Sequence, residues 1–472
     1  MKNKSLAFLS LLYTLNATGQ EMLGIVNSNF SGNIGITLNP ASVVGNPFGS
    51  EINFFSIDIS AHNNYLYIPA GEHGLSKLIT GQGLSHDNAK DYYTVSPDKQ
   101  MYANVFLLGP SVLFSTTESG WAFHTALRTN MSVQHLNYHI AKFLWEGFDY
   151  EPQHDIFFST NPYQFTMLQW YELGYTYGVT LMKTKTDMLT VGGTFNLNLG
   201  ANSAYIIGSK MDYIVPSSDT LIVYDLTGLY GHTITTNDPG ITDYIGVKGI
   251  GGGINMGVQY CKDRNEKAYN YNSRNRRKYK WKAGVSLIDA GMIHYFNKSR
   301  ELKFKNNSTI WPGIDTVKFD GINAFDETLN NQFTGTPDGA LNKTSLNVLL
   351  PTAASTQFDY NIYNDFYANF TWIQRLAFFE PQVQRANQLS LTFRYETSKF
   401  EVALPYTYYE YYKHRLGLAF RYKWFFLGTD KFGPIIDAWD VDGIDLYFGI
   451  KINNHKSGKS GKRNKDYCPA YN

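Results

Sequence analysis

Cysteine is nearly missing from this chain of 472 residues, which contains only Cys261 and Cys468. Two cysteines exclude a cysteine-rich disulfide scaffold and a four-cysteine zinc site. An excess of either charge is also missing, because 41 Lys and Arg stand against 40 Asp and Glu. A chain without a basic excess does not fit a nucleic-acid partner, since binding to phosphates requires positive charge.

Long apolar runs are missing as well. Beyond the N-terminus no stretch of about 18 apolar residues occurs, so we expect no transmembrane helix. The N-terminus itself has the pattern of a secretory signal peptide. Lys2 and Lys4 precede an apolar stretch over residues 6–15, and Ala17-Thr18-Gly19 matches a cleavage site. We therefore predict a cleaved signal and a mature chain that begins at Gln20.

Aromatic residues are abundant, with 35 Tyr and 31 Phe, and long stretches alternate between apolar and polar residues. Residues 389–396 (LSLTFRYE) place Leu, Leu, Phe and Tyr on one face and Ser, Thr, Arg and Glu on the other. Residues 415–424 and 444–452 follow the same pattern. Each stretch is as long as a tilted strand needs to cross a bilayer. Because the polar faces carry charges, we expect the apolar faces to point outward to lipid.

The predicted connections alternate between long and short. Tight turns are expected at 117–120 and 183–187, and long loops near 69–101, 135–163 and 208–242. This rhythm is typical of outer-membrane barrels, whose short turns are periplasmic and whose long loops are external. We predict the cell outer membrane of a Gram-negative bacterium as the location.

About twelve strands are clear, and weaker candidates lie at 301–305 and 345–350 within a long segment near 298–365. Bacterial single-chain barrels have an even number of strands. The predicted fold is therefore all-β, a transmembrane antiparallel β-barrel of 14 strands, with 12 as the alternative. The predicted regions are a signal peptide (1–19), a plug-like segment (20–50), the barrel (51–453) and a basic periplasmic tail (454–472).

Ten charged residues fall on the polar faces of the predicted strands. In lipid, Arg or Lys at the bilayer midplane would cost about 2–4 kcal/mol, so we expect these side chains to point into the lumen. They would either fill the lumen as ion pairs or line a path for a solute or a bed for the N-terminal segment. The predicted lumen-lining residues are Arg128, Glu172, Arg394, Glu396, Glu401, Arg415, Arg421, Lys423, Asp445 and Lys451.

Motifs for chemistry are weak. The glycine run at 249–257 lies within a predicted strand and not between a strand and a helix, so it does not indicate a nucleotide site. His135 and His139 lack a carboxylate pattern for a metal. His124 and His294 lie on predicted strands without a convincing Ser/His/Asp set. We predict no enzyme activity, no metal and no cofactor.

Two features point toward the periplasm. Cys261 and Cys468 are both expected on that side, an oxidising compartment, and a disulfide between them is possible. The basic stretch at 274–282 and the basic tail could contact an acidic periplasmic partner, although such runs are more often only solvated.

The residues also carry a family resemblance. Asn39-Pro40-Ala41, ahead of the first strand, resembles the N-terminal hatch of FadL-type outer-membrane transporters of hydrophobic compounds. Residues 284–291 (GVSLIDAG), 400–406 (FEVALPY), 427–430 (LGTD) and 443–449 (GIDLYFG), with the Cys-Pro tail, resemble a group of FadL-like barrels of the Bacteroidota related to type IX secretion accessory barrels. The resemblance implies a barrel of about fourteen strands with an N-terminal plug.

Two functions follow as hypotheses. The first is passage of small hydrophobic or amphipathic compounds across the outer membrane past the plug formed around Asn39, Pro40 and Ala41. The second is a non-conducting barrel that serves as a scaffold or accessory subunit of a secretion or envelope complex. A continuous apolar pocket beneath the plug would favour the first, and a lumen packed with paired charges would favour the second.

Overall fold

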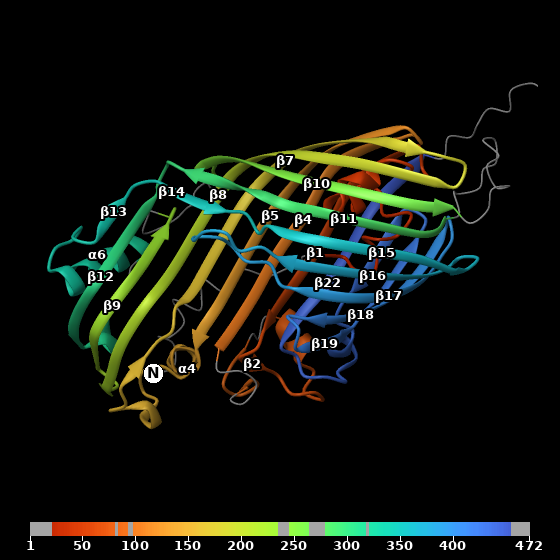
Figure 1. Ribbon diagram of the computed structural model, residues 1–472. Coiled ribbons are helices and arrows are strands. Elements are labelled where there is room, and N and C mark those ends of the chain that lie inside the picture. Colours follow the sequence, from red (N-terminus) through yellow and green to blue (C-terminus); the bar gives the residue numbers. More distant parts are fainter. Residues whose placement is uncertain are drawn as a thin grey trace, which may run out of the picture.

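The wall is a closed antiparallel barrel. The computed structural model describes residues 21–80, 84–92, 98–234, 245–263, 279–317 and 321–454. Fourteen strands close into a ring, as predicted, because β1 pairs with both β4 and β22 (Figure 1). In order around the ring they are β1 (Ser50–Asn63), β4 (Asp98–Ser115), β5 (Ser119–Asn137), β7 (Tyr163–Lys183), β8 (Asp187–Ser217), β10 (Gly249–Asp263), β11 (Tyr279–Tyr295), β15 (Ala353–Tyr363), β16 (Phe366–Arg375), β17 (Gln388–Glu396), β18 (Phe400–Tyr409), β19 (Lys413–Leu416) continued by β20 (Leu418–Tyr422), β21 (Phe425–Thr429) and β22 (Gly443–Asn454).

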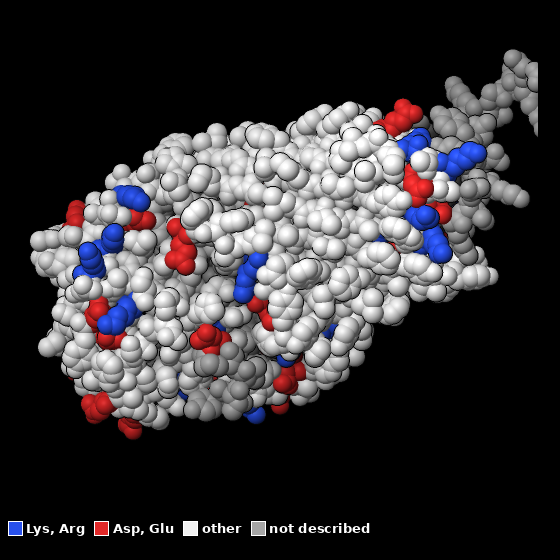
Figure 2. Space-filling model, viewed as in Figure 1, with Lys and Arg blue, Asp and Glu red and all other residues white. Residues whose placement is uncertain are grey.

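The wall has the reverse of a soluble protein's pattern of burial. On β17, Ser390, Thr392 and Arg394 are buried, whereas Leu391 and Phe393 between them are exposed. In Figure 2 charged residues gather toward the two ends of the barrel, and the surface between them includes a broad uncharged stretch. Apolar side chains outside and polar side chains inside suit a wall surrounded by lipid. The chain is thus built as an outer-membrane type of β-barrel.

The connections are short at one end and long at the other. At the short end, Thr116 and Ser119 close the turn between β4 and β5, and Thr184 and Asp187 close the turn between β7 and β8. Both Ser50, where β1 begins, and Asn454, where β22 ends, lie at this end. The predicted basic stretch at 274–282 is described only in part: residues 279–282 begin β11 and are not a turn. Residues 274–278, the tail beyond 454 and the predicted signal peptide lie outside the described residues.

The expected long loop at 208–242 is wrong in its first part. β8 continues to Ser217, and a turn at Ser218-Asp219 leads into β9 (Thr220–His232), which pairs with β8. The reason is tertiary: Tyr213 and Val215 of β8 bury their side chains against Val223 of β9 in a separate apolar cluster. β12 (Arg300–Pro312) pairs with β9 in turn, so part of the long segment near 298–365 is also sheet.

These strands form a lobe beyond the barrel at the long-loop end. Helix α6 (Ile322–Thr334) covers β12, and helix α4 (Tyr138–Glu146) contributes Phe143 to the same apolar cluster. The smaller elements are α2 (Gly35–Leu38), η1 (Pro40–Val43), β2 (Leu66–Tyr67), α3 (Gly74–Ile79), β3 (Lys90–Asp91), η2 (Glu151–Gln153), β6 (Phe158–Ser159), η4 (Ile314–Thr316), β13 (Leu341–Lys343), β14 (Leu346–Leu349) and η5 (Gly433–Ile436). None of the helices in the described ranges is long and apolar enough to cross a bilayer.

The segment that precedes β1 lies inside the barrel. Residues 21–26 are all buried, and Ile25 packs in a cluster with Leu108 of β4, Ile288 of β11 and Ala403 of β18. Partners from strands on different sides of the ring are within reach only from the lumen. We call residues 21–34 the head and residues 39–44, which include η1, the anchor.

Candidate functional site

The anchor contains the three predicted plug residues, Asn39, Pro40 and Ala41, and all three are buried. The Asn39 side chain caps η1 by accepting a hydrogen bond from the backbone nitrogen of Ala41 at 3.0 Å. Its amide nitrogen donates to Gln357 Oε1 on β15 at 2.9 Å. Pro40 stands at the first position of η1, where no backbone N–H is needed. Asn-Pro-Ala thus shapes a short turn and attaches it to the wall.

Glycines of five neighbouring strands receive the anchor. They project from β5, β7, β8, β10 and β11, and a Cβ at any of them would lie 2.1–2.7 Å from an atom of the anchor. At Gly192, for example, it would lie 2.6 Å from the carbonyl carbon of Pro40. At Gly120 and Gly192 the nearest anchor atom is backbone and cannot move aside, so only glycine permits so close an approach there. The five are Gly120, Gly178, Gly192, Gly257 and Gly284.

The head is held by side chains of the C-terminal strands. Ser28 Oγ donates to Glu401 Oε2 at 2.8 Å, and the backbone nitrogen of Leu23 donates to Asp430 Oδ2 at 2.9 Å. Lys451 Nζ donates to the carbonyl oxygens of Phe30 and Ser31. These contacts satisfy backbone groups of an irregular segment that the barrel shields from water.

The wall groups that hold the head are also paired with one another. Arg421 Nε lies 2.7 Å from Glu401 Oε2, and Lys451 Nζ lies 3.3 Å from Glu51 Oε2. All four side chains are fully buried. Arg394 makes a further pair of this kind, at 3.0 Å to Glu396 and 2.5 Å to Asp359. Glu401, Lys451 and Arg394 therefore keep a charged partner whether or not the head is present.

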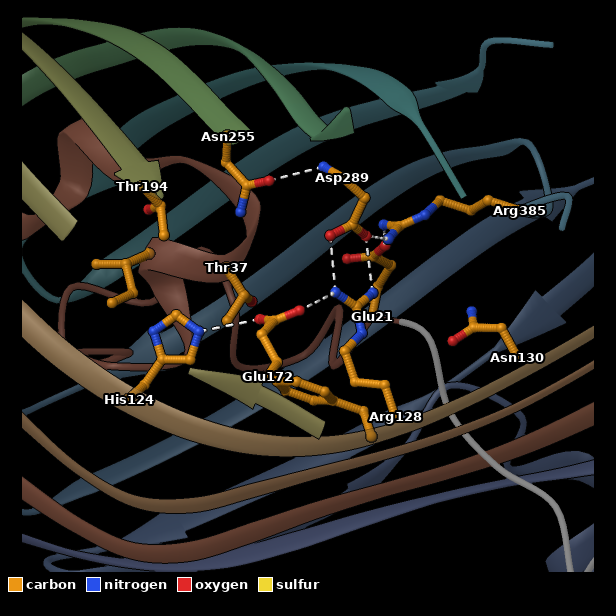
Figure 3. A pocket seen from close by; sticks show the side chains of 12 residues that line it. Glu21, Thr37, His124, Arg128, Asn130, Glu172, Thr194, Asn255, Asp289 and Arg385 are labelled. Atoms are coloured by element: carbon orange, nitrogen blue, oxygen red, sulfur yellow. Dashed lines mark hydrogen bonds and ion pairs between the residues drawn. The ribbon is translucent and has the colours of Figure 1, made fainter. Parts of the chain in front are cut away.

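The first residue of the head takes part in a chain of charged side chains across the lumen (Figure 3). Glu21 pairs with Arg385, which also pairs with Asp289 of β11. Arg128 of β5 binds Asp289 through two hydrogen bonds of 2.7 Å and reaches Glu172 of β7 at 3.3 Å. The chain therefore joins the head to three wall strands and to the loop that carries Arg385.

The chain of charges has support around it. His124 Nε2 lies 3.0 Å from Glu172, and the Trp170 indole nitrogen donates to the same carboxylate at 3.3 Å. The Arg128 guanidinium lies over the Trp170 ring, 4.9 Å from its centroid. Asn255 of β10 accepts a hydrogen bond from the backbone nitrogen of Asp289 at 2.7 Å. Buried charges with this many partners hold fixed positions.

Two cavities border the head in the described part of the chain. One, of about 30 Å³, is lined by the charged chain, and the other, of about 110 Å³, lies between head, anchor and wall and is lined by both polar and apolar side chains. Ligand pockets usually measure about 300–1,000 Å³. With the head in place, neither cavity has room for more than a few water molecules.

Nine of the ten predicted lumen residues have their side chains inside the barrel. Arg415 lies over the ring of Tyr409, 3.3 Å from its centroid, and Asp445 accepts a hydrogen bond from the backbone nitrogen of Asp430 at 2.6 Å. The other seven belong to the pairs described above. The prediction for Lys423 is wrong, because this residue is exposed in the turn between β20 and β21, with φ of 53°. The two-residue alternation ends with β20 at Tyr422. The prediction extended it by one residue, into the turn, and so placed Lys423 inside the barrel.

The sequence analysis missed several members of the site. Asp289 lies on a strand that the pattern did identify, next to a bulge at which the register between β10 and β11 shifts. Arg385 lies in a loop, where no periodicity can indicate that a side chain is buried.

Cys261 is buried, and its proposed partner Cys468 lies outside the described residues. His294, the second strand histidine, is exposed and faces Asn347 at 2.7 Å.

Comparisons with known proteins give one family and several solved structures. The toluene transporter TbuX of Ralstonia pickettii is 8% identical over 94% of this chain and 100% of that chain, with a TM-score of 0.38. The toluene transporter TodX of P. putida is 9% identical over 90% and 95% of the two chains, with a TM-score of 0.40. A FadL homologue of Pseudomonas aeruginosa is 8% identical over 93% and 99%, with a TM-score of 0.33.

Identities and TM-scores this low carry no inference about a ligand. A search of curated protein sequences finds no significant match. The model of a family of unknown function, DUF5723, matches residues 40–430, which include the anchor from Pro40 onward and most of the wall. The chain belongs to this family, DUF5723.

Proposed function

We propose that this protein passes small amphipathic compounds across the outer membrane, and that its N-terminal segment (residues 20–50) is the plug that closes the path. In this proposal the signal peptide is cleaved after residue 19 and the short turns and the basic tail face the periplasm. The head moves out of the lumen when the path opens, while the anchor stays seated on its glycines.

The observation that supports the proposal is the pairing of the wall charges. Glu401 keeps Arg421 and Lys451 keeps Glu51 when the head leaves. Breaking a buried pair by removal of one partner costs about 3–5 kcal/mol, and release of the head avoids this cost at both pairs. The apolar face of the head, with Met22 and Ile25, opposes release. The closed form therefore predominates, and opening is an infrequent event.

The lining of the lumen favours amphipathic compounds over hydrocarbons. The wall behind the head presents both kinds of surface. Thr371, Thr392 and Asn369 are polar, whereas Leu108 and Ile373 are apolar. An alkane gains nothing from replacing water at the polar groups, whereas a compound with a polar head can hydrogen-bond to them. The sequence suggested hydrophobic or amphipathic compounds, and the lumen suits the amphipathic ones.

A scaffold is the second candidate. It is favoured by the filling of the lumen, since the cavities beside the head measure only about 30 and 110 Å³. In that case the resemblance to type IX secretion accessory barrels would indicate the kind of complex, and periplasmic proteins would bind the basic stretch at 274–282 and the basic tail. Transport and scaffolding differ in whether removal of the head opens a path.

Potassium chloride conductance in planar bilayers tests the proposal, together with uptake of decanoate and toluene into proteoliposomes. The full mature chain is compared with a variant that lacks residues 20–34 but keeps the anchor. Lys423→Gln serves as a control in an exposed turn. We expect the deletion to raise conductance and decanoate uptake at least tenfold, with toluene uptake less affected. A deletion variant that folds, stays closed and takes up neither compound would contradict the head as the sole barrier. The scaffold becomes the better account if the lumen also stays closed after residues 380–387, in the loop between β16 and β17, are replaced by a short linker.

A further inference from the structure

The connection between β16 and β17 is longer than its geometry requires. β16 ends at Arg375 and β17 begins at Gln388, so residues 376–387 form the loop between two adjacent antiparallel strands. Two to five residues suffice for such a hairpin. The loop begins at the rim of the long-loop end, where Phe378 and Phe379 are exposed, and then turns inward, so that residues 382–387 are buried. We call residues 380–387 the strap.

The strap crosses the whole width of the lumen. The backbone nitrogen of Gln384 donates to Ser132 Oγ of β5 at 2.9 Å. β5 is opposite β17 in the ring. From β17 to β5 one passes β18, β19–β20, β21, β22, β1 and β4 in one direction, and β16, β15, β11, β10, β8 and β7 in the other. A loop that leaves one wall and bonds to the opposite wall must span the opening between them.

Further contacts fix the strap along its course. The backbone nitrogen of Leu349 donates to the Pro381 carbonyl at 3.0 Å, and Gln164 of β7 donates to the Gln382 carbonyl at 2.8 Å. Val383 is fully buried in a cluster with Trp170 and other wall residues. Buried apolar contacts and satisfied backbone groups are the marks of an ordered element. The strap is therefore an ordered part of the lumen.

The strap meets the head at Arg385. One amino group of this guanidinium pairs with Glu21 of the head and the other pairs with Asp289 of the wall. Departure of the head leaves Arg385 paired with Asp289 alone, so the strap loses one of the two ion pairs that hold it there. Departure of the strap leaves Glu21 without Arg385, while Asp289 retains Arg128. The head is therefore the element that can leave first, and its presence stabilises the strap.

We propose that the strap is a second gate, which closes the lumen from the external side while the head closes it from the periplasmic side. This inference rests on the proposed function, because a gate has meaning only in a barrel that conducts. The two gates share Arg385, so opening is sequential: the head leaves, the hold on Arg385 is halved, and the strap follows.

A removable lock tests the second gate. Ser132→Cys and Gln384→Cys, in a Cys468→Ser background, place two thiols where the strap touches the opposite wall. The pair is made in the variant without residues 20–34, and potassium chloride conductance is measured under oxidising and reducing conditions. Phe114→Cys with Trp121→Cys is the matched control, because these residues are direct cross-strand partners on β4 and β5 and their side chains are exposed on the outer face, away from the lumen.

The expected result is a conductance at least tenfold lower in the oxidised strap pair than in the reduced one, with no change in the control pair. Equal conductance in both states, with the cross-link verified, would overturn the second gate and leave the proposed function intact. If the reduced protein is also closed, replacement of residues 380–387 by Gly-Ser-Gly decides. Conductance that appears only then supports the strap as the remaining barrier, and continued closure overturns both proposals.

Discussion

The head and the anchor are parts of one segment, yet the wall receives them in opposite ways. The anchor touches glycines and backbone atoms, and its Asn39 is bonded to the middle of the wall. The head touches long charged side chains, such as Glu401 and Lys451, which reach into the lumen from their strands. A backbone contact without side chains cannot yield, whereas a side chain can change rotamer. The anchor is therefore fixed to the wall, and in the proposed function the head is the part that leaves.

Lys451→Met should have the largest effect. It leaves the buried Glu51 without its cation and the head carbonyls of Phe30 and Ser31 without their donor. We expect a loss of about 3–5 kcal/mol in unfolding free energy, measured by urea titration in lipid vesicles. Glu51→Gln combined with Lys451→Met should recover much of that stability but not the closed state in conductance. If the double variant recovered both the stability and the closed state, Lys451 would not be the residue that holds the head.

Gly192→Ala tests the anchor. The added Cβ would lie 2.6 Å from the Pro40 carbonyl carbon, which is backbone and cannot move aside. We expect a loss of about 1–3 kcal/mol in unfolding free energy by the same titration. Gly193→Ala is the matched control on the next residue of β8, where the nearest atom is 3.7 Å away. Equal losses of unfolding free energy at the two positions would contradict the inference that Gly192 is needed for the contact with the anchor.

Ser28→Ala changes the head alone. Ser28 Oγ donates to Glu401 and accepts from the backbone nitrogen of Phe30 at 3.0 Å, while Glu401 keeps Arg421. We expect the closed state to lose about 1 kcal/mol relative to the open state. Single-channel records should show more frequent opening, while the unfolding free energy should hardly change. A lower unfolding free energy with unchanged opening would contradict the separation of head from wall.

Lys423→Gln should have the smallest effect. The side chain is exposed in a turn and lies over the ring of Tyr422, with Nζ 5.2 Å from its centroid. Surface changes of this kind usually stay within about 0.5 kcal/mol. Unfolding free energy and conductance should both match the unmodified protein. A marked change in conductance would indicate that the Lys423 side chain faces the lumen, as the sequence pattern predicted.

The wall could be predicted from sequence because a two-residue period is a local signal. Arg394, Arg421 and Lys451 follow from it, since each alternates with residues that face lipid. The partners of these residues were harder to predict. Asp289 follows a bulge, where the period changes phase, and the inward course of the strap depends on contacts with strands across the ring. Such contacts are properties of the closed barrel and leave no periodic trace in the loop itself.

The outer lobe shows the same limit from the other side. The sequence between 208 and 242 was expected to be a loop because the wall needs no more strand there. Tyr213 and Val223 nevertheless continue the sheet, because they pack against Trp311 of β12. The alternating pattern predicts the part of a strand that crosses the bilayer. It does not predict how far the strand continues beyond the membrane.

The Glu51–Lys451 pair has a consequence for how the protein is assembled. Glu51 lies on the first strand and Lys451 on the last, so the pair bridges the seam at which the barrel closes. Both residues also bind the head, Glu51 at the backbone nitrogen of Asn33 and Lys451 at two carbonyls. The part of the chain that is synthesised first therefore finds its binding site only when the last strand has been inserted. We therefore expect the head to be seated after the last strand has been inserted, where it would fasten the seam from within.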